Sequence, residues 1–420
     1  MQIAVRENPI HVRTLECGMP LLVEEMPGVR TAAFSWLVPA GNASDPADEA
    51  GDGWSSLLAE LAQRGAGDRD SRAFSDALDR AGVQRAVSPA AVHIVASGTT
   101  IGARLGEAMP LLADLIVRPH LPGDALEAVR SLAIQSLESL QDDPQHRVTL
   151  RLRERHLPPP FNRSGYGNRT AFERADIDSL RASWAARVRP VGSILAVAGA
   201  VKVDELARQL DTLLKGWHGT APDPVVTGEA LGGAFHEQDA SNQTHVAIGL
   251  CAPSERQSQS LHCRVATSIL GGETSSRLFT EVRERRGLCY SVSASYAGGR
   301  DRGMVFVYAG STPERARETY DTIRQELERF EQGVTPDEFR RAKIGFKSRL
   351  VMQGESTAAR AAALGSDWYR LGRCRSLGEL AAEVDALELD GLNEWIHEEM
   401  GPGWRTRMTL CTVGQQPLHA

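Results

Sequence analysis

The stretch from Gly271 to Val292 carries the residues of this chain that are most suggestive of chemistry. It reads GGETSSRLFTEVRERRGLCYSV and places Arg283 seven positions before Tyr290. Arginine keeps its charge at physiological pH, and a tyrosine hydroxyl remains a neutral donor up to a pKa of about 10. Both groups can therefore donate hydrogen bonds to negative charge that develops during a reaction.

The same stretch contains the signals of the elements that must position this pair. The glycines Gly271–Gly272 permit a tight or closely approached backbone, although they could also form only a turn. Thr274 or Ser275 can cap a following helix, and Gly287 can end it. Residues 288–296 then alternate like a strand. This order predicts that the last helical turn, with Arg283, folds back beside the start of the strand that carries Tyr290.

Each residue of the pair also has a plain structural interpretation. Arg283 lies among Arg277, Arg285 and Arg286, and such runs usually form a solvated helix face. A tyrosine on a strand most often packs in a core. The sequence pattern alone does not decide between these interpretations and a functional site.

Composition excludes several classes of protein. The chain has 420 residues, 47 Lys and Arg against 54 Asp and Glu, and a net charge of −7, which gives no basic footprint for nucleic acid. It contains no GxxxxGK[ST], GxSxG, HExxH or HxxEH motif. Its six cysteines are scattered without a CxxC pair, which argues against a disulfide framework or a structural zinc site.

Neither a targeting segment nor a membrane span is predicted. Residues 1–9 lack the apolar run of a signal peptide, and the longest nearly apolar run, residues 192–201, is too short to cross a bilayer. We therefore expect a cytoplasmic protein without membrane or nucleic-acid partners.

The order of elements repeats with a long period. A strand, an amphipathic helix, a turn and a long polar helix occur in both halves, and Leu121 and Asp124 are each 213 positions before Val334 and Asp337. A period this long indicates a duplicated domain, because solenoid repeats span about 20–50 residues.

The arrangement of strands and helices in blocks predicts an α+β fold with two homologous domains. Each domain is expected to be a largely antiparallel sheet with helices packed on one face. A segment rich in Gly and Pro supplies the boundary. We predict an N-terminal domain at 1–217, a linker at 218–233 and a C-terminal domain at 234–420.

With these residues in view, the sequence resembles the M16 metallopeptidases, the inverzincins, over essentially the whole chain. It is most similar to the short bacterial subfamily B, which is related to the mitochondrial processing peptidase. The GGxxSSRLFxEVRExRGLxYSV pattern matches a signature of the family's second half. The resemblance implies that Arg283 and Tyr290 bind the substrate carbonyl and stabilise the tetrahedral intermediate. It also implies substrate contacts at Gly271, Gly272 and Ser276.

The resemblance fails at the zinc motif. The two histidines of HxxEH fall on Ser56 and Glu60, and the catalytic glutamate falls on Ala59. The third ligand falls near Gln135 or Ser136. A serine and one carboxylate cannot form the three-ligand site that a catalytic zinc needs, so we expect no metal and no cofactor in this chain.

The leading hypothesis is therefore a non-zinc subunit of a heterodimeric M16B-type peptidase, inactive alone. A homologue with HxxEH would supply zinc and the general base, and this chain would supply Arg283, Tyr290 and half of a peptide chamber. The alternative is a catalytically silent structural or peptide-binding homologue, like the core proteins of respiratory complexes.

Overall fold

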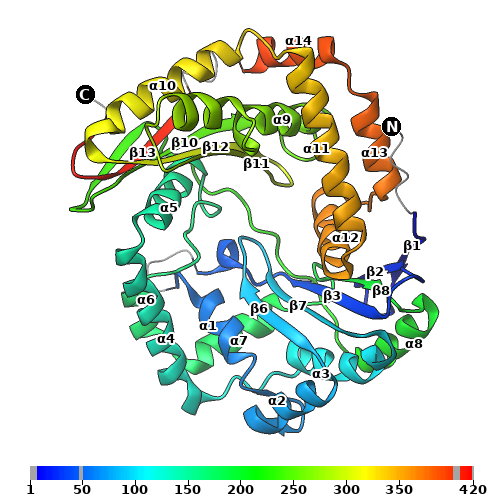
Figure 1. Ribbon diagram of the computed structural model, residues 1–420. Coiled ribbons are helices and arrows are strands. Elements are labelled where there is room, and N and C mark those ends of the chain that lie inside the picture. Colours follow the sequence, from blue (N-terminus) through cyan, green and yellow to red (C-terminus); the bar gives the residue numbers. More distant parts are fainter. Residues whose placement is uncertain (1–6, 47–50, 401–406, 419–420) are drawn as a thin grey trace.

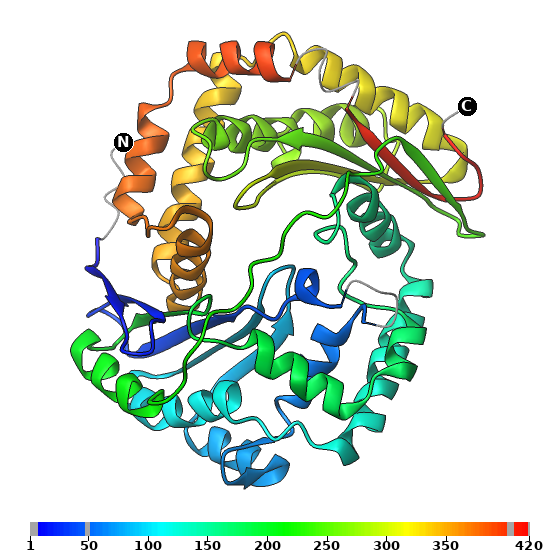
Figure 2. The same cartoon turned by 180° about the vertical axis from the view of Figure 1, so that it is seen from behind.

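Two mixed sheets face one another across the molecule, each backed by helices (Figures 1 and 2). The computed structural model describes residues 7–46, 51–400 and 407–418. The expectation that no signal peptide is present rests mainly on residues 1–6, and these lie outside the described part. Among the described residues, no helix combines the length and apolar character needed to span a bilayer.

The first sheet has the strand order β1-β2-β8-β3-β7-β6. Its strands are β1 (Ile10–Thr14), β2 (Pro20–Glu25), β3 (Thr31–Val38), β6 (Gln84–Pro89), β7 (Ile94–Ile101) and β8 (Ile194–Gly199). β2 and β8 run parallel, and every other neighbouring pair is antiparallel.

The second sheet repeats this plan in the order β11-β12-β10-β13-β9. Its strands are β9 (Ala234–Gln238), β10 (Thr244–Ala252), β11 (Ser291–Gly298), β12 (Gly303–Ser311) and β13 (Thr409–Gly414). Again one pair, β9 and β13, is parallel. The predicted α+β class with largely antiparallel sheets is confirmed.

Helices cover the outer face of each sheet. In the N-terminal half these include α1 (Trp54–Leu61), α2 (Ser71–Arg80), α3 (Leu105–Val117), α4 (Leu126–Ser139), α6 (Arg169–Arg174), α7 (Ile177–Arg187) and α8 (Val203–Leu213). In the C-terminal half they include α9 (Ser260–Thr267), α10 (Ala316–Phe330), α11 (Pro336–Gly354) and α14 (Leu389–Glu399), and α13 (Leu377–Ala386) packs against α11.

Short elements connect these parts. They are the 3₁₀ turns η1 (Asn42–Ser44), η2 (Gly102–Arg104), η3 (Gly123–Ala125), η4 (Leu140–Asp142) and η7 (Pro313–Arg315), the π-helical segments η5 (Ser268–Gly272) and η6 (Phe279–Arg285), and the strand pair β4 (Gly65–Ala66) and β5 (Arg69–Asp70).

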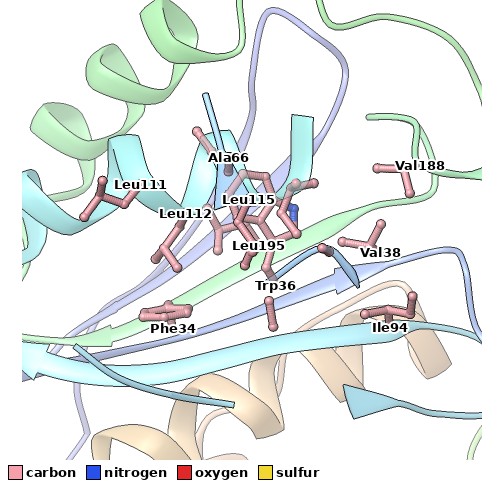
Figure 3. Close-up of a cluster of buried hydrophobic side chains, with 14 of the residues drawn as sticks. Phe34, Trp36, Val38, Ala66, Ile94, Leu111, Leu112, Leu115, Val188 and Leu195 are labelled. Atoms are coloured by element: carbon pink, nitrogen blue, oxygen red, sulfur yellow. The ribbon is translucent and has the colours of Figure 1, made fainter. Parts of the chain in front are cut away.

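The core of the N-terminal half lies between its sheet and its outer helices (Figure 3). Phe34, Trp36 and Val38 alternate along β3 and point to the side on which Leu112 and Leu115 of α3 lie. The Trp36 ring meets the edge of Trp217 at a centroid distance of 6.3 Å. Because Trp36 is fully buried, truncating it to alanine should cost about 3–5 kcal/mol.

One helix from each half packs on the inner face of the other half's sheet. Val148 and Leu152 of α5 (Pro144–His156) join a cluster with Ala247 of β10, and Leu364 of α12 (Thr357–Leu371) packs against Leu22 of β2. The two helices stand between the sheets in both views (Figures 1 and 2). Each sheet thus has helices on its outer face, as predicted, and in addition one helix from the other half on its inner face.

The domain boundaries at residues 217 and 233 remain a prediction. Each half contributes a helix that packs on the sheet of the other half, so packing alone does not divide the chain there. Between Leu213 and Ala234 the chain forms no helix or strand. Two contacts hold this segment against the rest of the protein. Thr227 N–H donates to Pro159 O at 2.9 Å, and Asp223 forms an ion pair with Arg300.

Candidate functional site

Arg283 lies on η6 with an exposed side chain that has no ion pair and donates no side-chain hydrogen bond within the described part of the chain. Its guanidinium carbon lies 4.8 Å from the centre of the Phe279 ring, one helical turn back. A stacking contact at an exposed site is worth only about 0.5–1 kcal/mol. The guanidinium can therefore leave the ring to meet a ligand at little cost.

Tyr290 lies one residue before β11, and its side chain is 61% exposed. Its backbone N–H donates to Gly310 O on β12 at 2.9 Å, which fixes the main chain. Leu288 and Val292, which alternate with it, are buried. The interpretation of Tyr290 as a core tyrosine is therefore wrong, because its ring lies in solvent although the strand pattern would bury it.

The turn between Arg283 and Tyr290 is formed as predicted. Gly287 has φ +60°, and its N–H donates to Arg283 O at 3.1 Å, which ends the helix. Burial raises the pKa of the Cys289 thiol to about 11, and the charge of Arg283 acts against that rise. The guanidinium thus lies within electrostatic reach of the residue next to Tyr290.

The glycine loop has mainly a packing role. A Cβ on Gly271 would lie 2.5 Å from the backbone nitrogen of Ala294, so only glycine lets this helix end approach β11. Gly271 and Ser276 are buried, which does not favour the substrate contacts predicted for them, whereas Gly272 is exposed. The following helix begins at Arg277, so neither Thr274 nor Ser275 caps it.

The positions that the resemblance assigns to the zinc motif all lie on α1, but their side chains make other contacts. Ser56 Oγ donates to Gly165 O at 2.8 Å, Ala59 is 2% exposed, and Glu60 pairs with Arg64 four residues later. One carboxylate that is already neutralised and one hydroxyl do not fit a zinc ion.

The helix that would carry the third ligand is α4, which packs against α1. Gln135 and Ser136 are both exposed there, and the Ser136 hydroxyl donates to Leu132 O within its own helix. In the part of the chain that the structure describes, no group of three or more His, Cys, Asp or Glu side chains is arranged to hold a metal ion.

A buried polar network next to α1 could not be predicted from the sequence. Asp45 accepts from the backbone N–H of Ser55 at 3.0 Å and pairs with Arg187 at 3.0 Å, and Ser55 Oγ also donates to Asn42 Oδ1. Burial raises the pKa of Asp45, and Arg187 opposes that rise. The partners of Asp45 are up to 142 positions away, so no local pattern could indicate them.

Comparison with known proteins connects this arrangement to one family. Residues 174–346 match the family model described as the peptidase M16 inactive domain. An uncharacterized zinc protease of Mycobacterium leprae is 26% identical over 405 residues, which cover 94% of this chain and 90% of that protein.

Solved structures show the same fold. The structure described as a peptidase M16 inactive domain from Pseudomonas fluorescens has a TM-score of 0.86 at 18% identity and covers 98% of this chain and 100% of that one. A chain of complex III from Candida albicans has a TM-score of 0.81 at 18% identity, covering 97% and 96%. Residues 174–346 thus match an M16 peptidase domain, nearly the whole chain is similar to uncharacterized zinc proteases, and its fold is that of the M16 structure from Pseudomonas fluorescens.

Proposed function

We propose that this chain is the non-zinc subunit of a heterodimeric M16B-type peptidase. The observation that carries the proposal is the combination of two exposed donors, Arg283 and Tyr290, which have no hydrogen-bond or ion-pair partner for their side chains among the described residues, with an α1 that lacks the histidines of a zinc motif. A protein that kept only its fold would have no evident need for donors held in this way.

In the proposed mechanism, Arg283 and Tyr290 receive the oxygen of the scissile carbonyl. The backbone bond from Tyr290 to Gly310 and the helix end at Gly287 hold the two side chains on rigid elements before substrate arrives. Donors placed in advance stabilise charge more in the transition state than in the ground state. The partner, an M16 homologue with HxxEH, supplies the metal and the general base.

The second candidate is a catalytically silent structural or peptide-binding role. The similarity to a chain of Candida albicans complex III favours it only through the shared fold. The two candidates differ in what they require of Arg283 and Tyr290, because only the first needs these side chains to bind the substrate carbonyl.

Reconstitution tests the proposal. The chain is purified from its native cells, any co-purifying M16 protein with an HxxEH motif is identified by mass spectrometry, and the two recombinant proteins are assayed separately and together on a quenched peptide library. We expect hydrolysis only in the mixture. An inert mixture of the two folded proteins would favour the silent role.

A further inference from the structure

A second candidate site lies in the C-terminal half, and its lining includes neither Arg283 nor Tyr290. It is a cavity of about 1320 Å³ bounded by α9, β11, α11, α12 and α13. Pockets for small molecules typically measure about 300–1,000 Å³, so this one has room for several residues of an extended chain.

The cavity corresponds by the internal repeat to the region of the degenerate zinc motif. In the N-terminal half, α1 packs against α4 and β6; in the C-terminal half, α9 and η5 pack against α11 and β11. The duplicated half therefore keeps an open cavity beside the helix that is equivalent to α1.

One cation in this cavity is free. Seven arginines and four carboxylates line it, and six of the arginines have an ion-pair partner, namely Arg256, Arg264, Arg349, Arg360, Arg373 and Arg375. The seventh, Arg370, has no ion pair and donates no hydrogen bond within the described residues, while its backbone O accepts from Arg256 Nε at 2.8 Å. Its guanidinium is thus available to a ligand.

The cavity also contains a buried carboxylate, Glu255. This residue is 5% exposed, its Oε1 pairs with Arg264, and its Oε2, which accepts no hydrogen bond among the described residues, lies 3.9 Å from Arg375 Nη2. Both carboxylate oxygens thus face arginines, which leaves Arg370 as the charged group that can meet a ligand. Burial raises the pKa of the neighbouring Tyr296 and the charge of Arg370 opposes that rise, so both lie in the same part of the cavity.

These features select the chemistry of the ligand. One free guanidinium matches one carboxylate, with which it can form a bidentate pair. Six of the seven lining arginines already have ion-pair partners, so the one remaining guanidinium matches a single carboxylate better than a polyanion such as a nucleic acid. Apolar side chains, including Phe346, Leu350 and Leu387, provide walls for aliphatic groups.

We propose that this cavity binds a polypeptide segment whose carboxylate is received by Arg370. The inference rests on the proposed function, in which the chain handles peptide substrates, and it gives the chain a preference for an acidic residue or a free C-terminus away from the scissile bond.

Calorimetric titration of the purified chain with acetylated alanine–leucine octapeptides tests the inference. The first peptide carries a central aspartate and an amidated C-terminus, the second a central asparagine and an amidated C-terminus, and the third a central asparagine and a free C-terminal carboxylate. We expect the first or third peptide to bind at least about tenfold more tightly than the second, which also identifies the source of the carboxylate.

Variants localise the effect. Arg370→Gln should remove the difference between peptides, and Ser295→Glu, which adds a negative charge to the lining, should weaken the carboxylate peptide selectively. Arg72→Gln, at an exposed position on α2, is the matched control and should behave as wild type. Equal binding of all three peptides to the wild type, or an unchanged preference in both cavity variants, would overturn the inference. Hydrolysis by the reconstituted pair is read separately, so a failure here is distinguishable from failure of the subunit role.

Discussion

At the residue scale, Arg283 and Tyr290 are exposed donors on either side of the turn at Gly287. Sequence spacing indicated that they could lie near each other, but it could not indicate that Tyr290 is solvent-exposed. Residues 288, 292 and 294 are buried, so alternation alone would place the ring in the core. The Tyr290 ring is nevertheless exposed, at the position directly before β11 begins at Ser291.

The first prediction concerns Arg283. In the reconstituted peptidase, Arg283→Ala should lower kcat/KM by about 10²–10³, partly through a higher KM, since the guanidinium also holds the ground-state carbonyl. Arg283→Lys should recover only part of this, because an ammonium lacks the planar fork. Steady-state kinetics measure both effects.

Two neighbouring arginines provide the controls. Arg285 pairs with Glu281, and Arg286 donates to the Thr322 hydroxyl at 3.4 Å. Alanine at either position should leave kcat/KM within about twofold of wild type, as expected for surface contacts. An equal loss in all three variants would mean that the positive surface, and not Arg283 itself, is responsible.

The second prediction concerns the zinc motif. The triple variant Ser56→His, Ala59→Glu and Glu60→His should not acquire a tightly bound zinc, because the third ligand is missing and Ala59 is buried against the core. A glutamate there buries a charge and overpacks the helix, so the variant should also lose stability. Metal analysis that finds one zinc per folded chain would contradict this reasoning.

At the scale of the elements, α5 and α12 determine how the halves fit together. Their apolar faces could be predicted from sequence, but a helical pattern does not say which sheet will cover it. A strand such as β10, from Thr244 to Ala252, can be predicted from sequence, because its apolar run is strong and local. The exchange of helices depends instead on contacts between residues far apart in the sequence, such as that of His156 with Thr409 and that of Arg360 with Glu24, which are 253 and 336 positions apart.

The third prediction tests that contact. Arg360 on α12 and Glu24 on β2 pair at 2.7 Å with 1% and 2% of their side chains exposed. Arg360→Met should lower the free energy of unfolding by about 3–5 kcal/mol, because it leaves a buried charge unpaired. Adding Glu24→Gln should restore part of the loss. Urea denaturation measures both variants, with the exposed Arg317→Met as control; a loss below 1 kcal/mol would show that the pair does not secure α12.

At the scale of the whole molecule, several distant segments meet around His93. Its ring meets Tyr369 of α12 edge-on at a centroid distance of 4.7 Å, and the nearby charges are Asp223 of the connecting segment and Arg300 of the β11–β12 hairpin. Burial lowers the pKa of His93 to about 4. The burial of His93, and with it its low pKa, therefore depends on the contact between the two halves.

The fourth prediction follows from that shift. Below pH 6.5 the unfolded chain takes up a proton at His93 while the folded chain does not, so stability falls as the pH drops from 6.5 towards 4. At pH 5 this difference in proton uptake lowers the free energy of unfolding by about 2 kcal/mol relative to neutral pH. His93→Phe should flatten the pH dependence of unfolding in this range, whereas His218→Gln, at an exposed position, should not. Equal slopes for His93→Phe and wild type would contradict the assignment.

The split active site itself is tested most directly by Tyr290→Phe in the reconstituted pair. The change removes one hydroxyl that has no hydrogen-bond partner within the described residues, so folding and assembly should survive, as gel filtration would verify. We predict that kcat falls by about 10²–10³ relative to wild type, because the donor acts mainly in the transition state. A kcat within about twofold of wild type, with the complex intact, would contradict the split active site and leave the chain as a silent structural partner.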